Sequence, residues 1–444
     1  MVLFSKIIRR LFIVSLIFIP FLEIQGKDTV KRHNKIIKFE QHFNDSTLRL
    51  DYIFGSGPSG PRVFLESMTK QAGWAGRKSR LNEVPLQGNG TVIVTDSQSG
   101  DTIYMNPFST LSQEWFNSSE SLLRDVDFEN SFLVPLPKTQ AIIRIVLRDN
   151  HFNEIATSEA IYDPTDELIA VKGETPFPYE YLHKGSSDNN SIDIAILAEG
   201  YREEEMDRFI ERAGRIKDEI LSYEPFKSNK EKFNFIAVKT PSKDSGVSIP
   251  SKNIWKNTLF KSHFSTFHSE RYLTVPRVWR MHESLEGIPY EHIFLIVNTQ
   301  EYGGGGFFNS YQVASSDNEL KLPVAVHEFG HSFAGLADEY FYEGEEDDTY
   351  PLDVEPWEGN ITTLVDFNQK WVEKLLPGTT IPTPWEDSKN QESDTSLGVY
   401  EGGGYRIKGV YRPMVTCRMR DNFHPTFCPV CEEILESVIN FYTE

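Results

Sequence analysis

Residues 324–340, with the sequence VAVHEFGHSFAGLADEY, constrain the fold of this chain more than any other segment. They place two histidines, a glutamate and an acidic pair in an otherwise apolar stretch. The stretch follows an apolar run, HIFLIVNT, and a glycine-rich one, YGGGGFFNSY, and Pro323 precedes it. Because proline is tolerated in the first turn of a helix, we predict a helix that follows a buried strand and a loop.

The two histidines have the spacing of zinc ligands. On a helix, His327 and His331 lie about 40° and about 6 Å apart, so both imidazoles project from one face and can occupy adjacent corners of a tetrahedral site. Glu328 lies beside them, where a carboxylate can take the proton of a water that the metal activates. Packing alone would leave these polar groups unsatisfied in an apolar core. The pattern predicts a Zn²⁺ site with Glu328 as the catalytic base.

A third protein ligand must come from beyond the helix. If the helix continued, Asp338 would lie about 10 Å past His331 along the axis, too far for a bond of about 2 Å to the same ion. Gly335 stands where a left-handed residue would end the helix and turn the chain. We therefore expect Asp338 to reach the metal, with Glu339 as the alternative.

The N-terminus has the pattern of a secretory signal peptide. Basic residues precede an apolar run of about eleven residues, short of the roughly 20 that a membrane-spanning helix needs. We predict that residues 1–26 are removed and that the protein is exported to the periplasm, the cell surface or the medium, without stable membrane insertion. An uncleaved N-terminal anchor is the alternative.

The formal net charge of −20 argues against a nucleic-acid partner, because binding to phosphates depends on lysine and arginine. It predicts a soluble, acidic surface.

The distribution of apolar runs and turn-forming residues along the sequence predicts two domains. Residues 27–162 contain short β-rich runs such as TLRLDYIFG, GTVIVTD and AIIRIVLRD, separated by turn-forming residues, which predicts an all-β sandwich with an accessory role. Residues 163–190 are rich in Pro, Gly, Ser and acidic residues and are predicted to form a linker. In residues 191–444 the apolar runs SIDIAILAEGY, FNFIAVKT and EHIFLIVNT alternate with an amphipathic helix, which predicts an α/β catalytic domain.

Three cysteines lie close together near the C-terminus: Cys417, Cys428 and Cys431. The CPVC spacing would suit half of a zinc site, but a second CxxC or a spaced histidine pair is missing. In an exported protein we therefore expect a local disulfide between two of them.

Four stretches of the chain resemble the family of bacterial zinc peptidases called IgA peptidase M64: ILAEGY, YGGGGFFNS, HEFGHSFAGLADEY and GVYRPMVTCRMR with FCPVC after it. The resemblance covers residues from about 191 to the C-terminus, and the β-rich region is similar to the domain that precedes the peptidase in members of this family. It implies a metzincin-like zincin domain that hydrolyses protein or peptide substrates with zinc.

Compared with the usual metzincin pattern, this sequence has its glycine, Gly335, and its third candidate ligand, Asp338, one position late. The identity of the third ligand therefore stays open. The resemblance also implies a methionine beneath the zinc, for which we prefer Met419 over Met414. The glycine run from Gly303 to Gly306 would leave a strand edge open to the backbone of an extended substrate.

The residues predict metal-assisted peptide hydrolysis. Two alternative functions would use the same residues. One is a zinc hydrolase of a non-peptide bond, such as a cell-wall or glycan amide. The other is a surface protein that binds glycans or proteins and carries a structural metal. A fourth metal position open to solvent would indicate catalysis, whereas four protein ligands would indicate a structural site. Neither the natural substrate nor the oligomeric state follows from the sequence.

Overall fold

Two four-stranded sheets form the N-terminal region of the computed structural model, which describes residues 36–186, 191–341, 349–385 and 396–444. One sheet has the order β5-β1-β2-β8 and the other β4-β3-β6-β7. The strands are β1 (Phe43–Ser56), β2 (Arg62–Ala72), β3 (Gly90–Asp96), β4 (Thr102–Phe108), β5 (Val126–Pro137), β6 (Ala141–Arg148), β7 (Glu154–Tyr162) and β8 (Ala170–Lys172). The predicted signal peptide lies outside the described residues.

The two sheets share one core. Alternate residues of β1 point inward because successive side chains of a strand face opposite sides: Leu48, Leu50, Tyr52 and Phe54 are all fully buried. They belong to one apolar cluster with inward residues of the second sheet, such as Val94. Two short helices, α1 (Phe39–His42) and α2 (Leu111–Phe116), accompany the sheets. A capping box between Thr110 and Gln113 begins α2.

The segment between the two regions, expected to be a linker, contributes a strand to each of them. β8 pairs with β2 in parallel, and β9 (Tyr179–Lys184) pairs antiparallel with a strand of the second region. The side chains of β8 are exposed, so these strands lack the buried apolar face by which the other strands were identified.

A six-stranded mixed sheet organises the second region, in the order β13-β14-β12-β10-β11-β9. The four central strands are parallel and the outer two are antiparallel to their neighbours. The remaining strands are β10 (Ile192–Glu199), β11 (Phe233–Val238), β12 (His292–Val297), β13 (Gly304–Gly306) and β14 (Gln312–Ser315). β10, β11 and β12 confirm the three strands predicted from apolar runs.

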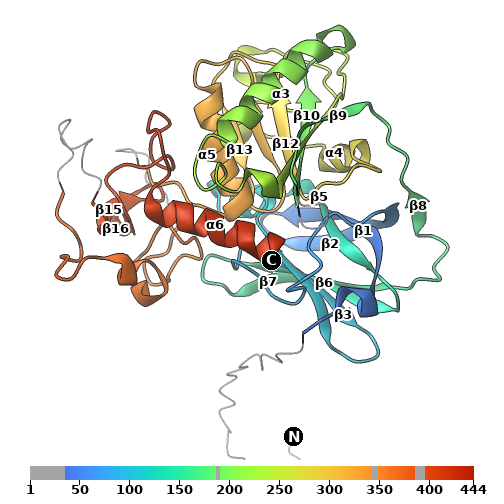
Figure 1. The fold of residues 1–444 in the computed structure, drawn as a ribbon, viewed down its shortest axis with the longest axis horizontal. Helices are drawn as coiled ribbons and strands as arrows, with labels where there is room; N and C mark the ends of the chain where they lie inside the picture. The colour runs from blue at the N-terminus through green and yellow to red at the C-terminus, as the bar shows by residue number, and fades with distance from the viewer. Residues whose placement is uncertain (1–35, 187–190, 342–348, 386–395) are drawn as a thin grey trace, which may run out of the picture. The chain divides into compact units, whose positions relative to one another are not determined.

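Helices cover both faces of this sheet (Figure 1). On one face, α3 (Met206–Ile220), α5 (Lys321–Ala334) and α6 (Pro429–Thr443) share a core with the side chains of Ile194 and Ile196. On the other face, α4 (Val278–Ser284) packs near Ala195 and Leu197. A hairpin, β15 (Tyr400–Gly403) and β16 (Arg406–Arg412), precedes α6. The chain is therefore a mixed α+β protein, with a region of two β-sheets followed by an α/β region.

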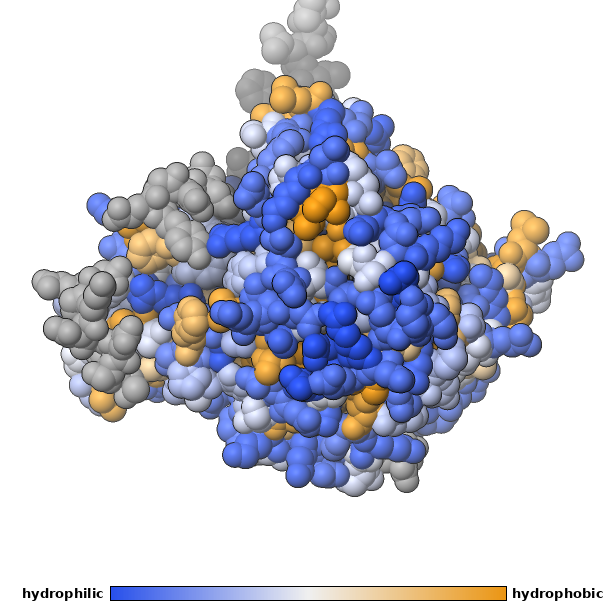
Figure 2. All heavy atoms as spheres, turned by 90° about the horizontal axis from the view of Figure 1, so that it is seen from above, coloured by the Kyte–Doolittle hydropathy of each residue, from blue (hydrophilic) through white to orange (hydrophobic). Residues whose placement is uncertain are grey.

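On the face drawn in Figure 2, hydrophilic residues dominate and the hydrophobic ones form small, separate patches. Among the described residues, no helix combines the length and the apolar character required to cross a bilayer.

Candidate metal centre

The helix α5 ends where the sequence predicted. Pro323 lies in its first turn, and Gly335 follows its last residue with φ 57° and ψ 33°, a left-handed conformation. The Gly335 N–H donates to the carbonyl of His331 at 2.9 Å. The predicted left-handed end is confirmed, and the chain turns back towards the histidines.

This turn brings Asp338 to both histidines. Its Oδ1 lies 2.9 Å from Nε2 of His327 and 3.3 Å from Nε2 of His331, and the two Nε2 atoms are 3.0 Å apart. Nitrogen ligands of a tetrahedral zinc with bonds of about 2.0 Å would lie about 3.3 Å apart. The three atoms are therefore spaced as ligands of one ion. Glu339, the alternative third ligand, faces another cluster.

Backbone carbonyls fix the protonation of both imidazoles. Nδ1 of His327 lies 3.1 Å from the Arg418 oxygen, and Nδ1 of His331 lies 2.5 Å from the Leu336 oxygen. Since a carbonyl only accepts, each Nδ1 carries the proton and each Nε2 presents a lone pair. The buried Oδ1 of Asp338 has no hydrogen-bond donor. When both imidazoles are neutral, three lone pairs therefore converge on one point, an arrangement that fits a cation.

The electrostatics favour the same conclusion. Burial alone would lower the pKa of His331, but without a metal the charge of Asp338 raises that pKa to about 9, so a proton takes the place of the cation. Burial would raise the pKa of Asp338, and the two histidines instead hold it far below its usual range. Each shift stabilises positive charge between these side chains.

Tyr405 holds the carboxylate from behind. Its hydroxyl donates to Oδ2 of Asp338, the oxygen that does not face the histidines. Its ring packs edge-on against Tyr340, with centroids 5.3 Å apart, and Tyr340 in turn stacks beside His327. The sequence analysis missed Tyr405, because it lies on the β15–β16 turn, far along the chain, and no local pattern marks it.

Glu328 is partly buried and lies against the glycine strand β13. A Cβ atom on Gly304 would stand 2.6 Å from Oε1 of Glu328, so a larger residue there would force this side chain to shift. Burial raises the pKa of Glu328, although His327 and His331 oppose the rise. The expected open strand edge is partly occupied, because Gly304 forms a bridge with Tyr272.

A cleft of about 920 Å³ lies above these residues, and we call it the metal-site cleft. It exposes His327, Glu328, His331 and Asp338. The N-terminal region, for which the sequence indicated only an accessory role, forms part of its wall. Its lining includes Asn89, Ser109, Thr110, Gln113, Glu114, Asn150 and Phe152 from that region.

Glu114, which lines the cleft from the N-terminal region, has a raised pKa. Burial raises the pKa of its carboxyl group to about 7, although the hydroxyl of Tyr272, which donates to it, acts in the opposite direction. The sequence analysis missed this residue because nothing in the α2 sequence indicates proximity to the histidines.

Met419, the preferred candidate for the methionine beneath the metal, is fully buried. A Cβ atom on Gly330 would lie 2.8 Å from its sulfur. Met419 therefore packs directly against α5, the helix that carries both histidines. Met414 belongs to the same apolar core.

The expectation of a local disulfide is wrong. All three cysteines are free and buried. The sulfurs of Cys417 and Cys431 are 3.8 Å apart, and the thiol of Cys431 donates to Oε1 of Glu339 at 3.2 Å. A carboxylate from a distant segment enters this cluster, which the spacing of the cysteines alone did not reveal.

Two family patterns match the chain. The family pattern of IgA Peptidase M64 matches residues 181–397 and 389–439, and that of the Peptidase M64 N-terminus matches residues 38–157. No curated protein matches the chain. The first match contains both histidines and Asp338, and the second covers most of the two-sheet region. The chain therefore belongs to the IgA peptidase M64 family, and its peptidase domain follows that family's N-terminal domain.

Proposed function

We propose that this peptidase is a zinc-dependent endopeptidase in which His327, His331 and Asp338 hold the metal and Glu328 is the general base. The observation that carries the proposal is the convergence of Nε2 of His327, Nε2 of His331 and Oδ1 of Asp338, within 3.3 Å of one another, on the wall of an open cleft. Among the residues that the structure describes, three protein ligands meet there, which leaves a position for substrate and favours a catalytic site over a structural one.

When bound, zinc would lower the pKa of an attacking water to about 7 and polarise the carbonyl of the scissile peptide bond. The chain's own residues do the rest. Glu328 takes the proton of the water and then gives it to the leaving amine. Its raised pKa suits the first of these steps, because a carboxylate with a higher pKa is a stronger base and takes the proton more readily.

The surroundings keep the donors in place before any metal or substrate binds. The carbonyls of Arg418 and Leu336 fix the two imidazole tautomers, and Tyr405 fixes Asp338. Such partners of metal ligands orient them and strengthen binding.

The same proposal extends to the architecture and location of the protein. We infer a zincin-like catalytic domain over residues 191–444, preceded by a β-sandwich over residues 27–162, with residues 163–190 between them. The helix α5 lies against β14 and the antiparallel outer strand β13, which supports this inference. We also infer export, on the basis of the signal-like sequence of residues 1–26.

The test combines a zinc assay with cleavage of a peptide library by the purified protein, with and without a chelator. We expect cleavage that stops on zinc removal, returns on zinc addition and is absent in Glu328→Gln. If the zinc-loaded protein cuts no peptide but releases an amine from cell-wall or glycan amides, the substrate is such an amide and not a peptide. Full activity in Glu328→Gln would remove the assigned base.

A further inference from the structure

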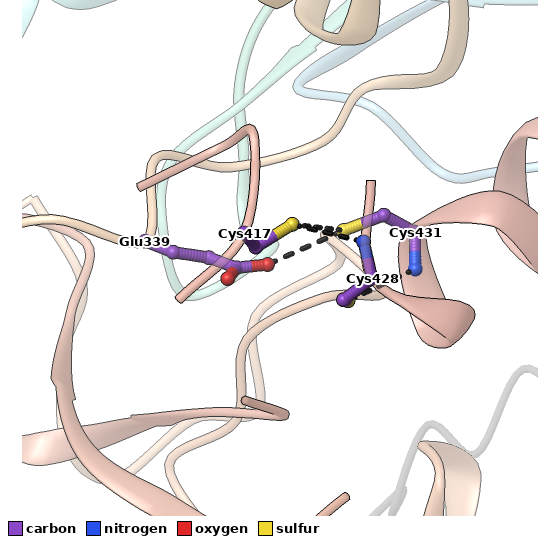
Figure 3. Close-up of side chains that lie close together, drawn as sticks. All are labelled: Glu339, Cys417, Cys428 and Cys431. Atoms are coloured by element: carbon purple, nitrogen blue, oxygen red, sulfur yellow. Dashed lines mark hydrogen bonds between the residues drawn. The ribbon is translucent and has the colours of Figure 1, made fainter. Parts of the chain in front are cut away.

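A second group of metal-ligating side chains lies behind the candidate metal centre. It consists of Glu339, Cys417, Cys428 and Cys431, and we call it the cysteine cluster (Figure 3). One ligand atom from each of the four lies within 4.8 Å of the others. All four side chains are buried, with exposed fractions of 0 to 2 %. They come from three segments: the turn after α5, the loop after β16, and the start of α6.

The distances fit a zinc ion better than a disulfide. The sulfurs of Cys417 and Cys431 are 3.8 Å apart. In a tetrahedral site with Zn–S bonds of about 2.3 Å, two sulfurs would lie about 3.8 Å apart, whereas a disulfide requires about 2.0 Å. Oε1 of Glu339 lies 3.2 Å from the Cys431 sulfur, near the roughly 3.5 Å expected between an oxygen and a sulfur ligand.

The hydrogen bonds around the cluster leave one buried oxygen unsatisfied. Oε1 of Glu339 accepts from the amide of Asn360 at 3.0 Å, but Oε2 is buried without a partner. A buried carboxylate oxygen without a donor or a cation is costly. A metal ion among the sulfurs, held by Oε1, would supply positive charge to this buried carboxylate as a whole.

Backbone groups favour the thiolate form that a metal needs. The N–H of Cys428 donates to the Cys417 sulfur at 3.1 Å, and the N–H of Cys431 donates to the Cys428 sulfur at 3.5 Å. Cys428 also caps the N-terminus of α6, where the positive end of the helix dipole stabilises a thiolate.

We propose that Glu339, Cys417, Cys428 and Cys431 bind a second, structural zinc ion. Thiolate-rich tetrahedral sites select zinc among the common divalent metals, and four buried protein ligands leave no position for a substrate. Binding releases the thiol protons to solvent. This site is independent of the proposed catalysis, because it shares no ligand with the candidate metal centre.

The second zinc ion would stabilise the geometry of the candidate metal centre. Glu339 follows Asp338 directly, and Cys417 precedes Arg418, whose carbonyl fixes the tautomer of His327. A metal in the cysteine cluster would therefore link two segments of the candidate metal centre. One carries Asp338, and the other carries the carbonyl that orients His327.

Counting zinc in purified protein tests the proposal. We expect two zinc ions in the unaltered protein, one in His327→Ala/His331→Ala and one in Cys428→Ser/Cys431→Ser. Replacing zinc by Co²⁺ adds a second readout, because only cobalt bound to thiolate gives sulfur-to-metal charge-transfer absorption. This absorption should persist in the histidine variant and disappear in the cysteine variant.

If Cys428→Ser/Cys431→Ser fails to fold, the nearly isosteric variant Glu339→Gln replaces it. The measurement is then the rate at which cobalt is released. We expect slower release from the unaltered protein than from Glu339→Gln. Two results would overturn the proposal. One is a folded histidine variant that holds no zinc and shows no thiolate absorption with cobalt. The other is an unreduced protein lighter by two hydrogen atoms, with a disulfide among the three cysteines. Failure of the proposed catalytic site would instead leave the histidine variant with the full zinc content of the unaltered protein.

Discussion

Asp338 and Glu339 are adjacent in the chain, yet their carboxylates belong to two different clusters. Oδ1 of Asp338 lies 2.9 Å from Nε2 of His327, whereas Oε1 of Glu339 lies 3.2 Å from the sulfur of Cys431. The acidic pair that the sequence presented as two candidates for one position therefore serves two positions.

The carboxylate at position 338 should control metal retention. Asp338→Asn removes the charge but keeps the shape, so we expect zinc affinity at the candidate metal centre to fall by at least about tenfold. Glu328→Gln is the matched acid-to-amide control and should keep its zinc while losing hydrolysis by about 10² to 10⁴-fold. Competition with a chromophoric chelator measures the first effect and peptide cleavage the second. The reverse pattern would exchange the roles given to these two acids.

The hydroxyl of Tyr405 should matter although it touches no metal. It donates to Oδ2 of Asp338, and loss of such a partner typically costs about 10- to 100-fold in metal affinity or activity. We expect this loss in Tyr405→Phe. Tyr302→Phe serves as the control, since Tyr302 lines the cleft and its hydroxyl accepts from Asn422, away from the ligands. Equal zinc affinity in both variants would remove Tyr405 from the site.

A methyl group at Gly304 should displace Glu328, the proposed base. The added Cβ atom would stand 2.6 Å from Oε1 of Glu328, so Gly304→Ala should lower kcat/KM by about 100-fold, the lower end of a general base's contribution. Zinc content should stay unchanged.

Gly214→Ala is the matched control for this change. Gly214 lies within α3, and an added Cβ atom would meet nothing within 4 Å. We expect normal activity and a gain of about 0.5–1 kcal/mol in the free energy of unfolding, because alanine favours a helix more than glycine does. Unchanged kcat/KM in Gly304→Ala would show that Glu328 does not need its position beside Gly304 in order to act.

Asp193 should make stability depend on pH. Burial raises the pKa of its carboxyl group to about 6, although the Asn234 amide, which donates to it, opposes the rise. In the unfolded chain this pKa is about 3.9. The folded state therefore binds more protons between about pH 4 and pH 6, and stability falls as the pH rises through this window.

Asp193→Asn should remove this dependence. At pH 7 we expect the variant to be more stable than the unaltered protein by up to about 3 kcal/mol, with the difference vanishing near pH 4. Urea unfolding at both pH values measures it. The same difference at both would assign no role to this carboxyl group.

Local patterns predicted the parts of the site that one helix and its turn can specify. His327, Glu328 and His331 follow from helical spacing, and the left-handed Gly335 follows from the need to return Asp338 to the two histidines. Their relation could be worked out because only a few residues of backbone separate them. The strands β10, β11 and β12 were equally visible, since fully buried strands appear as continuous apolar runs.

Residues brought in by the topology could not be predicted in this way. Tyr405 reaches Asp338 from a hairpin turn, and Glu114 enters the cleft from the N-terminal domain. Glu339 joins the cysteines only because α5 and α6 pack side by side. A spacing rule based on paired cysteines or histidines does not anticipate a carboxylate from another segment.

The segment between the two domains has a consequence for the integrity of the protein. β8 covers the outer side of β2, and β9 covers the outer side of β11. Uncovered strands offer unpaired N–H and C=O groups to other chains and promote aggregation. A proteolytic nick between β8 and β9 would weaken the hold of both covering strands at once. An intact segment between β8 and β9 therefore protects each sheet from intermolecular pairing. Where other peptidases are present, the resistance of this segment to cleavage would determine how long the protein stays monodisperse.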